Sequence, residues 1–147
     1  DANRIALAGG SQGGGITLAV AGLVGDSVIA AMPNSPFLCH FRRAVAVAAS
    51  GPFSEITQYL SVHRDEVASV FTTLSYFDGA IFAKRCLAPA LFSVGLMDEI
   101  VPPSCVYATY NRYGSTDRQI EMYEFNGHEA GQFMHWQREV AWLRQRL

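Results

Sequence analysis

A serine flanked by glycines near the start of the chain could act as a nucleophile. Residues 9–13 read Gly-Gly-Ser-Gln-Gly, a G-x-S-x-G pattern between a short apolar run and a helix-like stretch. A strand–turn–helix of this kind strains the backbone of the nucleophile, and glycines two positions away on either side avoid collisions. We therefore predict Ser11 as the nucleophile, Gly9 and Gly13 as its elbow glycines, and the backbone amide of Gln12 as an oxyanion donor. An ordinary glycine turn is the alternative.

A serine alone is a poor nucleophile, so a base and an acid must also be present. Behind such an elbow they follow in the order serine, acid, histidine. Asp98 comes directly after one apolar run and His128 after another. Because sites in parallel sheets assemble at the carboxyl ends of strands, we predict His128 as the base and Asp98 as the acid that orients it. The alternatives are a helix-capping Asp98 with Glu99 as the acid, and a surface-loop His128. The weaker histidine candidates are His40, His63 and His135.

Metal and redox chemistry find no support in the spacing of histidines and cysteines. The four histidines form neither H-E-x-x-H nor H-x-H, and the three cysteines form no C-x-x-C. We therefore predict no metal and no other cofactor. The three cysteines are expected to be small buried thiols in a reducing cytoplasm, at Cys39, Cys86 and Cys105.

Short apolar runs alternate with helix-like segments along the chain. Strands are predicted at 4–8, 28–32 (stopped by a proline at 33), 90–94 and 119–125. This alternation predicts an α/β fold with about four parallel strands and helices on both faces.

Helices are predicted between and after these strands. One spans 12–24, and 37–85 is expected to be a helical insert, with Ser54 and Asp65 as N-caps of two of its helices. Another runs from the prolines at 102–103 to about 112. The tail at 132–147 is expected to be amphipathic, with an apolar stripe of Phe133, Trp136, Val140, Leu143 and Leu147.

Composition limits the domain organisation and the partners. A chain of 147 residues fits one domain, and 50% hydrophobic with 16% charged residues excludes intrinsic disorder. With 11 basic and 13 acidic side chains spread along the chain, neither a nucleic-acid footprint nor a polybasic membrane patch is present. No apolar run reaches bilayer-spanning length, and no secretion signal opens the sequence. We expect a cytoplasmic protein without nucleic-acid or membrane partners.

The first predicted strand begins almost at residue 1 and is apolar throughout, as a central strand would be. An edge strand would carry polar or lysine-bearing positions to blunt it. We therefore expect residues 1–147 to be one domain that lacks its N-terminal strands, the second half of a larger sheet.

Three short motifs resemble the signatures of one known family. Gly-Gly-Ser-Gln-Gly at 9–13, Leu-Met-Asp at 96–98 and Gly-His-Glu at 127–129 are similar to those of the acetyl xylan esterase/cephalosporin-C deacetylase family, carbohydrate esterase family 7. Similar segments also occur at 36–43, 73–78 and 98–104. The resemblance covers essentially the whole chain and implies the C-terminal half of an α/β-hydrolase fold. It implies Ser11 as nucleophile, His128 as general base and Asp98 as its partner.

Members of that family remove acetyl groups from short xylo-oligosaccharides and cephalosporin C, usually as hexamers and without a metal. The resemblance therefore implies a serine esterase for a small acetylated substrate. We expect it to work as a homo-oligomer or with a complementary N-terminal segment. Family members also have an N-terminal half with an Arg-Gly-Gln signature and a tyrosine whose backbone amide is the second oxyanion donor; no Arg-Gly-Gln occurs in this sequence.

Two other hypotheses stay open at this point. The chain could be a non-catalytic fragment that acts only in assembly, which the missing N-terminal half favours. It could also be another α/β-hydrolase, such as a dienelactone-hydrolase-like or peptidase-like enzyme. The Ser-Gln-Gly and Gly-His-Glu neighbours argue against this last reading.

Overall fold

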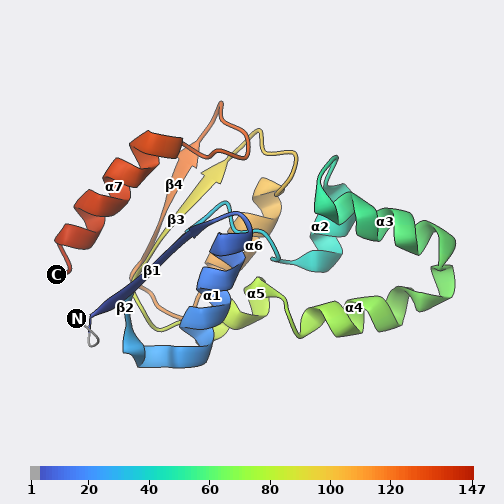
Figure 1. Cartoon of the computed structure of the whole chain (residues 1–147), viewed down its shortest axis with the longest axis horizontal. Coiled ribbons are helices and arrows are strands. Elements are labelled where there is room, and N and C mark those ends of the chain that lie inside the picture. Colours follow the sequence, from blue (N-terminus) through green and yellow to red (C-terminus); the bar gives the residue numbers. More distant parts are fainter. Residues whose placement is uncertain (1–3) are drawn as a thin grey trace.

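The computed structural model describes residues 4–147 and contains one parallel sheet (Figure 1). Its strands lie side by side in the order of the sequence: β1 (Ile5–Gly10), β2 (Val28–Asn34), β3 (Ala90–Gly95) and β4 (Arg118–Tyr123). Each neighbouring pair is parallel, so the four carboxyl ends meet at one edge of the sheet. The predicted α/β fold with four parallel strands is confirmed.

Helices cover both faces of this sheet (Figure 1). On one face α1 (Gln12–Val24) connects β1 to β2, and α6 (Pro103–Arg112) connects β3 to β4. On the other face lies α7 (Gln132–Arg144), which follows β4. Within residues 4–147, none of these or the remaining helices has the length and apolar character needed to cross a bilayer.

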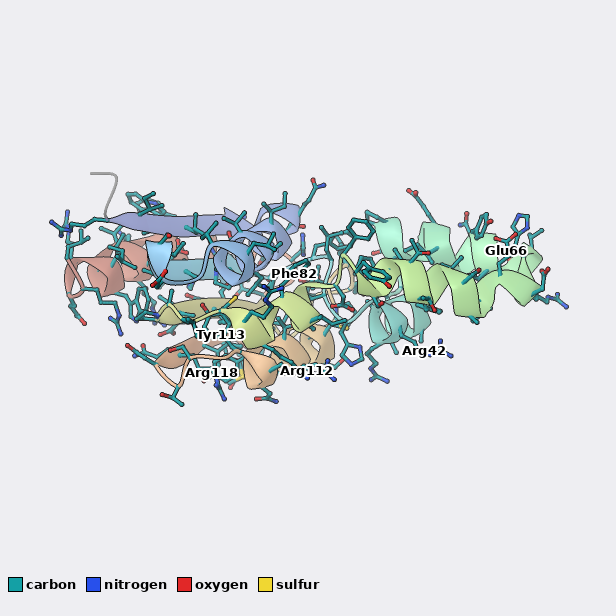
Figure 2. All side chains as sticks on the ribbon, turned by 90° about the horizontal axis from the view of Figure 1, so that it is seen from below. Arg42, Glu66, Phe82, Arg112, Tyr113 and Arg118 are labelled. Atoms are coloured by element: carbon teal, nitrogen blue, oxygen red, sulfur yellow. The ribbon has the colours of Figure 1, made fainter. Side chains whose placement is uncertain are left out.

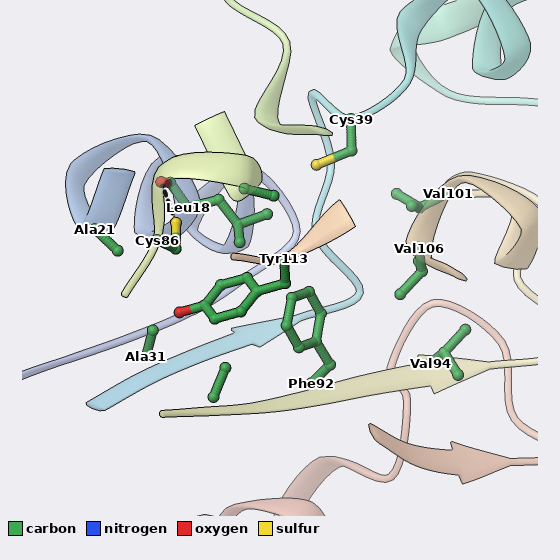
Figure 3. Packing of buried hydrophobic residues seen from close by; sticks show 12 residues of the cluster. Leu18, Ala21, Ala31, Cys39, Cys86, Phe92, Val94, Val101, Val106 and Tyr113 are labelled. Atoms are coloured by element: carbon green, nitrogen blue, oxygen red, sulfur yellow. Dashed lines mark hydrogen bonds between the residues drawn. The ribbon is translucent and has the colours of Figure 1, made fainter. Parts of the chain in front are cut away.

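Alternate strand residues pack against opposite layers, as the two-residue period of a strand requires. On the α1 side, Phe92 meets Tyr113 edge to face with ring centroids 5.5 Å apart, and Leu18 lies in the same cluster (Figure 3). On the α7 side, Leu91 packs with Trp142. Both faces of β3 are therefore buried, which explains its continuous apolar run.

The region 37–85 contains helices and no strand. These are α2 (Phe41–Val47), α3 (Pro52–Val62), α4 (Val67–Ser75) and α5 (Gly79–Phe82). Helices α2 to α4, hereafter the helical group, extend to one side of the sheet, with Glu66 at their far end (Figures 1 and 2). Helix α5 instead packs against α1 and α6.

One buried carboxylate joins the two ends of the helical group. Asp78, just before α5, accepts hydrogen bonds from the backbone amides of His40 (2.7 Å) and Phe41 (3.0 Å) at the start of α2. It also accepts from Ala80 N (2.9 Å) and so caps α5. The entry and exit of the helical group are thereby held at one side chain.

Two predicted N-caps are wrong. Helix α3 begins at Pro52 with Gly51 as its N-cap, because proline suits the first helical position and Gly51 adopts a φ of 75°. The Ser54 hydroxyl donates back to the Gly51 carbonyl instead of capping. Asp65 lies inside a short 3₁₀ turn, Arg64–Glu66, and α4 begins only at Val67.

Among residues 4–147, β1 pairs with β2 alone and lies at an edge of the sheet, where Ile5 is 44% exposed. Its predicted central place concerns a larger sheet than these four strands. The predicted burial pattern of α7, by contrast, is wrong. On α7 the face that meets the sheet is His135, Glu139 and Trp142, because the helix is turned so that its polar side faces β2 and β4. Of the predicted stripe, Leu143 packs on the sheet while Phe133, Trp136 and Leu147 are exposed.

Strand β2 continues through Pro33 to Asn34, although the proline was predicted to stop it. Ala31 N donates to the carbonyl of Pro89, just before β3 (2.9 Å), and Ser35 N donates to that of Ser93 within β3 (3.1 Å). Pro33 lies between them and has no N–H, so the ladder to β3 is interrupted there while the pairing with β1 persists. The strand is therefore long enough to place Asn34 beside the end of β1.

Candidate active site

Ser11 lies at the tight turn between β1 and α1, at the carboxyl edge of the sheet. Its backbone has φ 54° and ψ −119°, a conformation that costs a non-glycine residue on the order of 1–3 kcal/mol. Its N–H donates to the Asn34 carbonyl (2.9 Å), and its carbonyl accepts from Phe37 N (2.9 Å) and Gly15 N (3.1 Å). The segment that follows β2 therefore holds the strained peptide from both sides.

The two elbow glycines have different reasons to be glycine. A Cβ on Gly9 would lie 2.4 Å from the Gly13 carbonyl oxygen, so no side chain fits there. A Cβ on Gly13 would meet nothing within 4 Å. The predicted steric requirement thus holds at Gly9 and not at Gly13.

The loops that follow β3 and β4 bring Asp98 and His128 to Ser11. His128 Nε2 lies 2.8 Å from Ser11 Oγ, and His128 Nδ1 lies 2.8 Å from Asp98 Oδ2. Because an ionised carboxylate only accepts, Nδ1 carries the proton and the bare Nε2 accepts from the serine hydroxyl. The two loops pack closely, since a Cβ on Gly95 would lie 2.0 Å from the Gly127 carbonyl oxygen.

Asp98 is fixed by its backbone surroundings. Its Oδ1 accepts from Ile100 N (2.9 Å) and Val101 N (2.8 Å), which leaves Oδ2 for His128. The Asp98 side chain is 1% exposed and that of His128 is 27% exposed, so a substrate can reach the imidazole and not the carboxylate. The hydrogen bond to Asp98 raises the pKa of His128, against the opposing effect of burial. The imidazole is therefore a stronger proton acceptor than an ordinary histidine.

The Gln12 amide is the predicted oxyanion donor. Gln12 is the first residue of α1, and the first amides of a helix have no acceptor within it. The positive end of the helix dipole acts at the same place. The Gln12 amide is therefore available to a hydrogen-bond acceptor outside the helix.

The alternative acid and histidines lie elsewhere. Glu99 is exposed, and its neighbour Asp98 occupies the place beside His128. His63 stacks on Tyr59 at the exposed end of α3, and His40 precedes α2. His135 is buried on α7, which agrees with the packing role that was one of its two expected roles on the terminal helix. Within residues 4–147, no three His, Cys, Asp or Glu side chains lie close enough to hold a metal ion.

Sequence reasoning missed a buried polar cluster beneath Ser11. Its members come from β2, β3, β4 and α7: Asn34, Ser93, Tyr123, His135 and Glu139. The available signal was His135 and Glu139 at i and i+4 on a helix, which places both on one face. A polar residue directly after the apolar run of β2 was a second signal.

Comparison with known proteins relates the chain to acetyl xylan esterases. The family described as acetyl xylan esterase (AXE1) matches residues 1–146. An acetyl xylan esterase from Paenibacillus sp. R4 is 41% identical with a TM-score of 0.93, over 100% of this chain and 46% of that one. Acetyl xylan esterase 1 from Thermoanaerobacterium sp. JW/SL YS485 is 36% identical with a TM-score of 0.86, over 98% of this chain and 46% of that one.

A curated relative is more distant and longer. Acetyl esterase Axe7A from Xylanibacter ruminicola is 29% identical over 116 residues, 76% of this chain and 24% of that protein. The chain thus spans less than half the length of these three relatives. A monoacylglycerol lipase from Paleococcus ferrophilus, 18% identical with a TM-score of 0.71, shares the fold alone.

The α/β architecture therefore matches part of α/β-hydrolase esterase structures. The family match extends over almost every residue, including the turn at Ser11 and the loops of Asp98 and His128. The chain belongs to the acetyl xylan esterase (AXE1) family.

Proposed function

We propose that the chain carries the catalytic triad of a serine esterase, with Ser11 as nucleophile, His128 as general base and Asp98 as the acid that orients it. The observation that carries this proposal is the imidazole of His128, hydrogen-bonded at 2.8 Å on both sides. A hydroxyl, an imidazole and a buried carboxylate in this sequence of contacts are the groups that acyl transfer requires.

The reaction would proceed through an acetyl-enzyme. Ser11 Oγ attacks the acetyl carbonyl carbon while His128 Nε2 takes the hydroxyl proton, and the carbonyl electron pair moves onto oxygen beside the Gln12 amide. Collapse breaks the ester bond, and the departing alcohol takes the proton from His128. Water then attacks the acetyl group and gives its proton to His128. The bond between Ser11 Oγ and the acetyl carbon then breaks, Ser11 Oγ takes that proton from His128, and acetic acid leaves and ionises in water to acetate.

The substrate we propose is a small acetylated sugar or cephalosporin C. Membership of the family and the names of its relatives, which are acetyl xylan esterases and an acetyl esterase, support the acetyl group. Another α/β-hydrolase activity, such as that of a dienelactone hydrolase, is the alternative. The non-catalytic fragment is the second alternative, and it predicts an unreactive Ser11.

We also propose that a homo-oligomer or a complementary N-terminal segment completes the site. Strand β1 is paired on one side among the described residues, and such an edge favours pairing with another chain. Gln12 gives one oxyanion donor, and loss of one such donor costs about 10²–10³ in turnover. Adding the N-terminal half of a family member should therefore raise acetate-ester turnover by about that factor. Full turnover from a monodisperse monomer of the 147 residues would contradict it.

A reducing cytoplasm is the proposed location. The three cysteines are free and buried, and burial raises the pKa of Cys86 to about 12 and that of Cys105 to about 11. Such thiols remain protonated and unreactive at neutral pH. Fractionation of the source cells with an antibody to the chain tests this.

A fluorophosphonate probe tests the triad. The probe should label Ser11, and Ser11→Ala or His128→Ala should abolish the labelling. Ser61→Ala is the matched control, because its exposed hydroxyl donates only to the Gln58 carbonyl. Labelling that survives Ser11→Ala would refute the proposed nucleophile, and an unlabelled wild type would favour the non-catalytic alternative.

A further inference from the structure

The buried polar cluster beneath Ser11 is connected by hydrogen bonds through the Asn34 side chain. Asn34 Oδ1 lies 2.8 Å from His135 Nε2 and accepts from Ser93 Oγ at 3.3 Å. Asn34 Nδ2 donates to Glu139 Oε1 at 2.8 Å. Tyr123 O–H lies 3.1 Å from His135 Nδ1. Three secondary-structure elements, β2, β3 and α7, therefore meet at one amide, and β4 joins them through His135.

The cluster fixes the protonation of His135. Since Asn34 Oδ1 only accepts, His135 Nε2 must carry its proton, and the bare Nδ1 accepts from the Tyr123 hydroxyl. This neutral form satisfies both ring nitrogens. Burial lowers the pKa of His135 to about 4, and burial also raises the pKa of Glu139. The groups that face the imidazole are Glu139 at 3.8 Å, with Glu121 and Arg138 acting from farther away.

The cluster contacts the nucleophile turn through the backbone of Asn34. The Asn34 carbonyl accepts the N–H of Ser11, and the next amide, Ser35 N, donates to the Ser93 carbonyl. A Cβ on Gly14 would lie 2.9 Å from the Asn34 carbonyl oxygen, so the start of α1 is pressed directly against this peptide. A displacement of Asn34 would therefore displace Ser11.

The cluster contacts the His128 loop through Tyr123 and α7. A Cβ on Gly131 would lie 2.3 Å from the Tyr123 ring, so this loop rests on the ring. The loop enters α7 through three positive φ angles, at Ala130 (39°), Gly131 (88°) and Gln132 (41°). This conformation costs Ala130 and Gln132 free energy, so it persists only where contacts with the surrounding structure hold it. His135, one turn into α7, supplies such an anchor.

We propose that His135 and Asn34 are positioning residues, which hold the Ser11 turn and the His128 loop at a fixed separation. This inference rests on the proposed triad. His135 and Asn34 hold Ser11 and His128 in place and do not themselves touch the substrate. A hydrogen bond of 2.8 Å between Ser11 Oγ and His128 Nε2 joins two loops that are far apart in the sequence. A misplacement of about 1 Å between reacting groups costs about 10²-fold in rate, so such an anchor has a measurable effect.

Labelling kinetics of Ser11 with a fluorophosphonate probe test the proposal in the purified protein. His135→Ala should lower the maximal labelling rate about tenfold to a hundredfold and leave the probe's binding constant unchanged. His135→Gln restores an N–H donor toward Asn34 and should recover the rate to within about threefold of wild type. Tyr113→Phe is the matched control, because it removes a buried hydrogen bond to the Ala88 carbonyl far from Ser11.

The control should keep the labelling rate within about twofold at a comparable loss of thermal stability. If His135→Ala does not fold, Tyr123→Phe replaces it, since it removes only the hydroxyl that donates to Nδ1; it should slow labelling about threefold to tenfold. Rates no lower than that of the control, or no recovery by His135→Gln, would overturn the proposal. If wild type is not labelled at all, the proposed triad fails, and hydrogen exchange of the Ser11 amide then decides the anchoring. Unchanged protection of this amide in the variants would overturn it.

Discussion

Replacing Asp98 by asparagine should disable His128 without changing the shape of the site. In the wild type, Oδ1 of Asp98 accepts two backbone N–H groups, those of Ile100 and Val101. An asparagine must present its oxygen to these donors, which turns its NH₂ group toward His128 Nδ1. Nδ1 then has to accept, so the ring proton moves to Nε2.

The consequence is loss of the base. With a proton on Nε2, His128 donates to Ser11 Oγ and cannot take its proton. Loss of the orienting acid in such triads lowers turnover about 10⁴-fold, equivalent to about 5.4 kcal/mol of transition-state stabilisation. The Asp98→Asn protein should therefore react with a fluorophosphonate about 10⁴ times more slowly than wild type. Its ¹⁵N spectrum should show the proton of His128 moved from Nδ1 to Nε2.

Glu99→Gln is the matched control, because Glu99 is the exposed neighbouring acid and the same isosteric change removes its charge. Its labelling rate should stay within about twofold of wild type, since surface substitutions of this kind are close to neutral. If Asp98→Asn costs less than tenfold, or if Glu99→Gln costs as much, Asp98 is not the acid that orients His128.

Three further outcomes follow from the same structure. Gly9→Ala should lower the free energy of unfolding by about 1–3 kcal/mol in urea titrations, because its Cβ would meet the Gly13 carbonyl oxygen at 2.4 Å. Gly13→Ala should be tolerated, since its Cβ would meet nothing. Equal losses in the two variants would contradict this steric difference. Acetate esters should be cleaved faster than butyrate esters, each methylene costing about 1–3 kcal/mol in a small acyl pocket, and a rate that rises with acyl length would contradict an acetyl esterase. Acid should destabilise the fold through His135, whose pKa is lowered from 6.5 to about 4. The imidazole of the unfolded chain binds a proton at a higher pH than that of the folded chain, so stability is lost as the pH falls from 6.5 toward 4. The loss is about 3 kcal/mol at most and should be absent in His135→Gln when urea unfolding at pH 7 and pH 4.5 is compared.

The sheet and the triad contacts could be predicted because they depend on local signals. A continuous apolar run, such as that of β3, predicts a strand that is buried on both faces. Glycines around a serine predict a tight turn. The chain order serine, acid, histidine then selected Asp98 and His128, which the structure places within 2.8 Å of their partners. Their catalytic roles stay predictions.

The errors arose where distant parts of the chain decide local structure. Pro33 was predicted to end a strand, yet the neighbour on its other side, β1, keeps the ladder intact. The apolar residues of α7 suggested the wrong inner face, because Asn34, more than a hundred residues away, offers a partner to His135. The side-chain period of a helix does not reveal which polar residues find partners after folding.

The carboxylate of Asp78 brings the two ends of the helical group together at one point. Because the entry and exit of the helical group meet at this side chain, the length of chain between them has little effect on the sheet or on Ser11. Loops with adjoining ends accept insertions and replacements more readily than continuous elements. The base of the helical group packs against Cys105 and Ile100, so it must keep its shape. The far ends of α3 and α4 can diverge toward new contacts while the loops after β1, β3 and β4 continue to present the same three side chains.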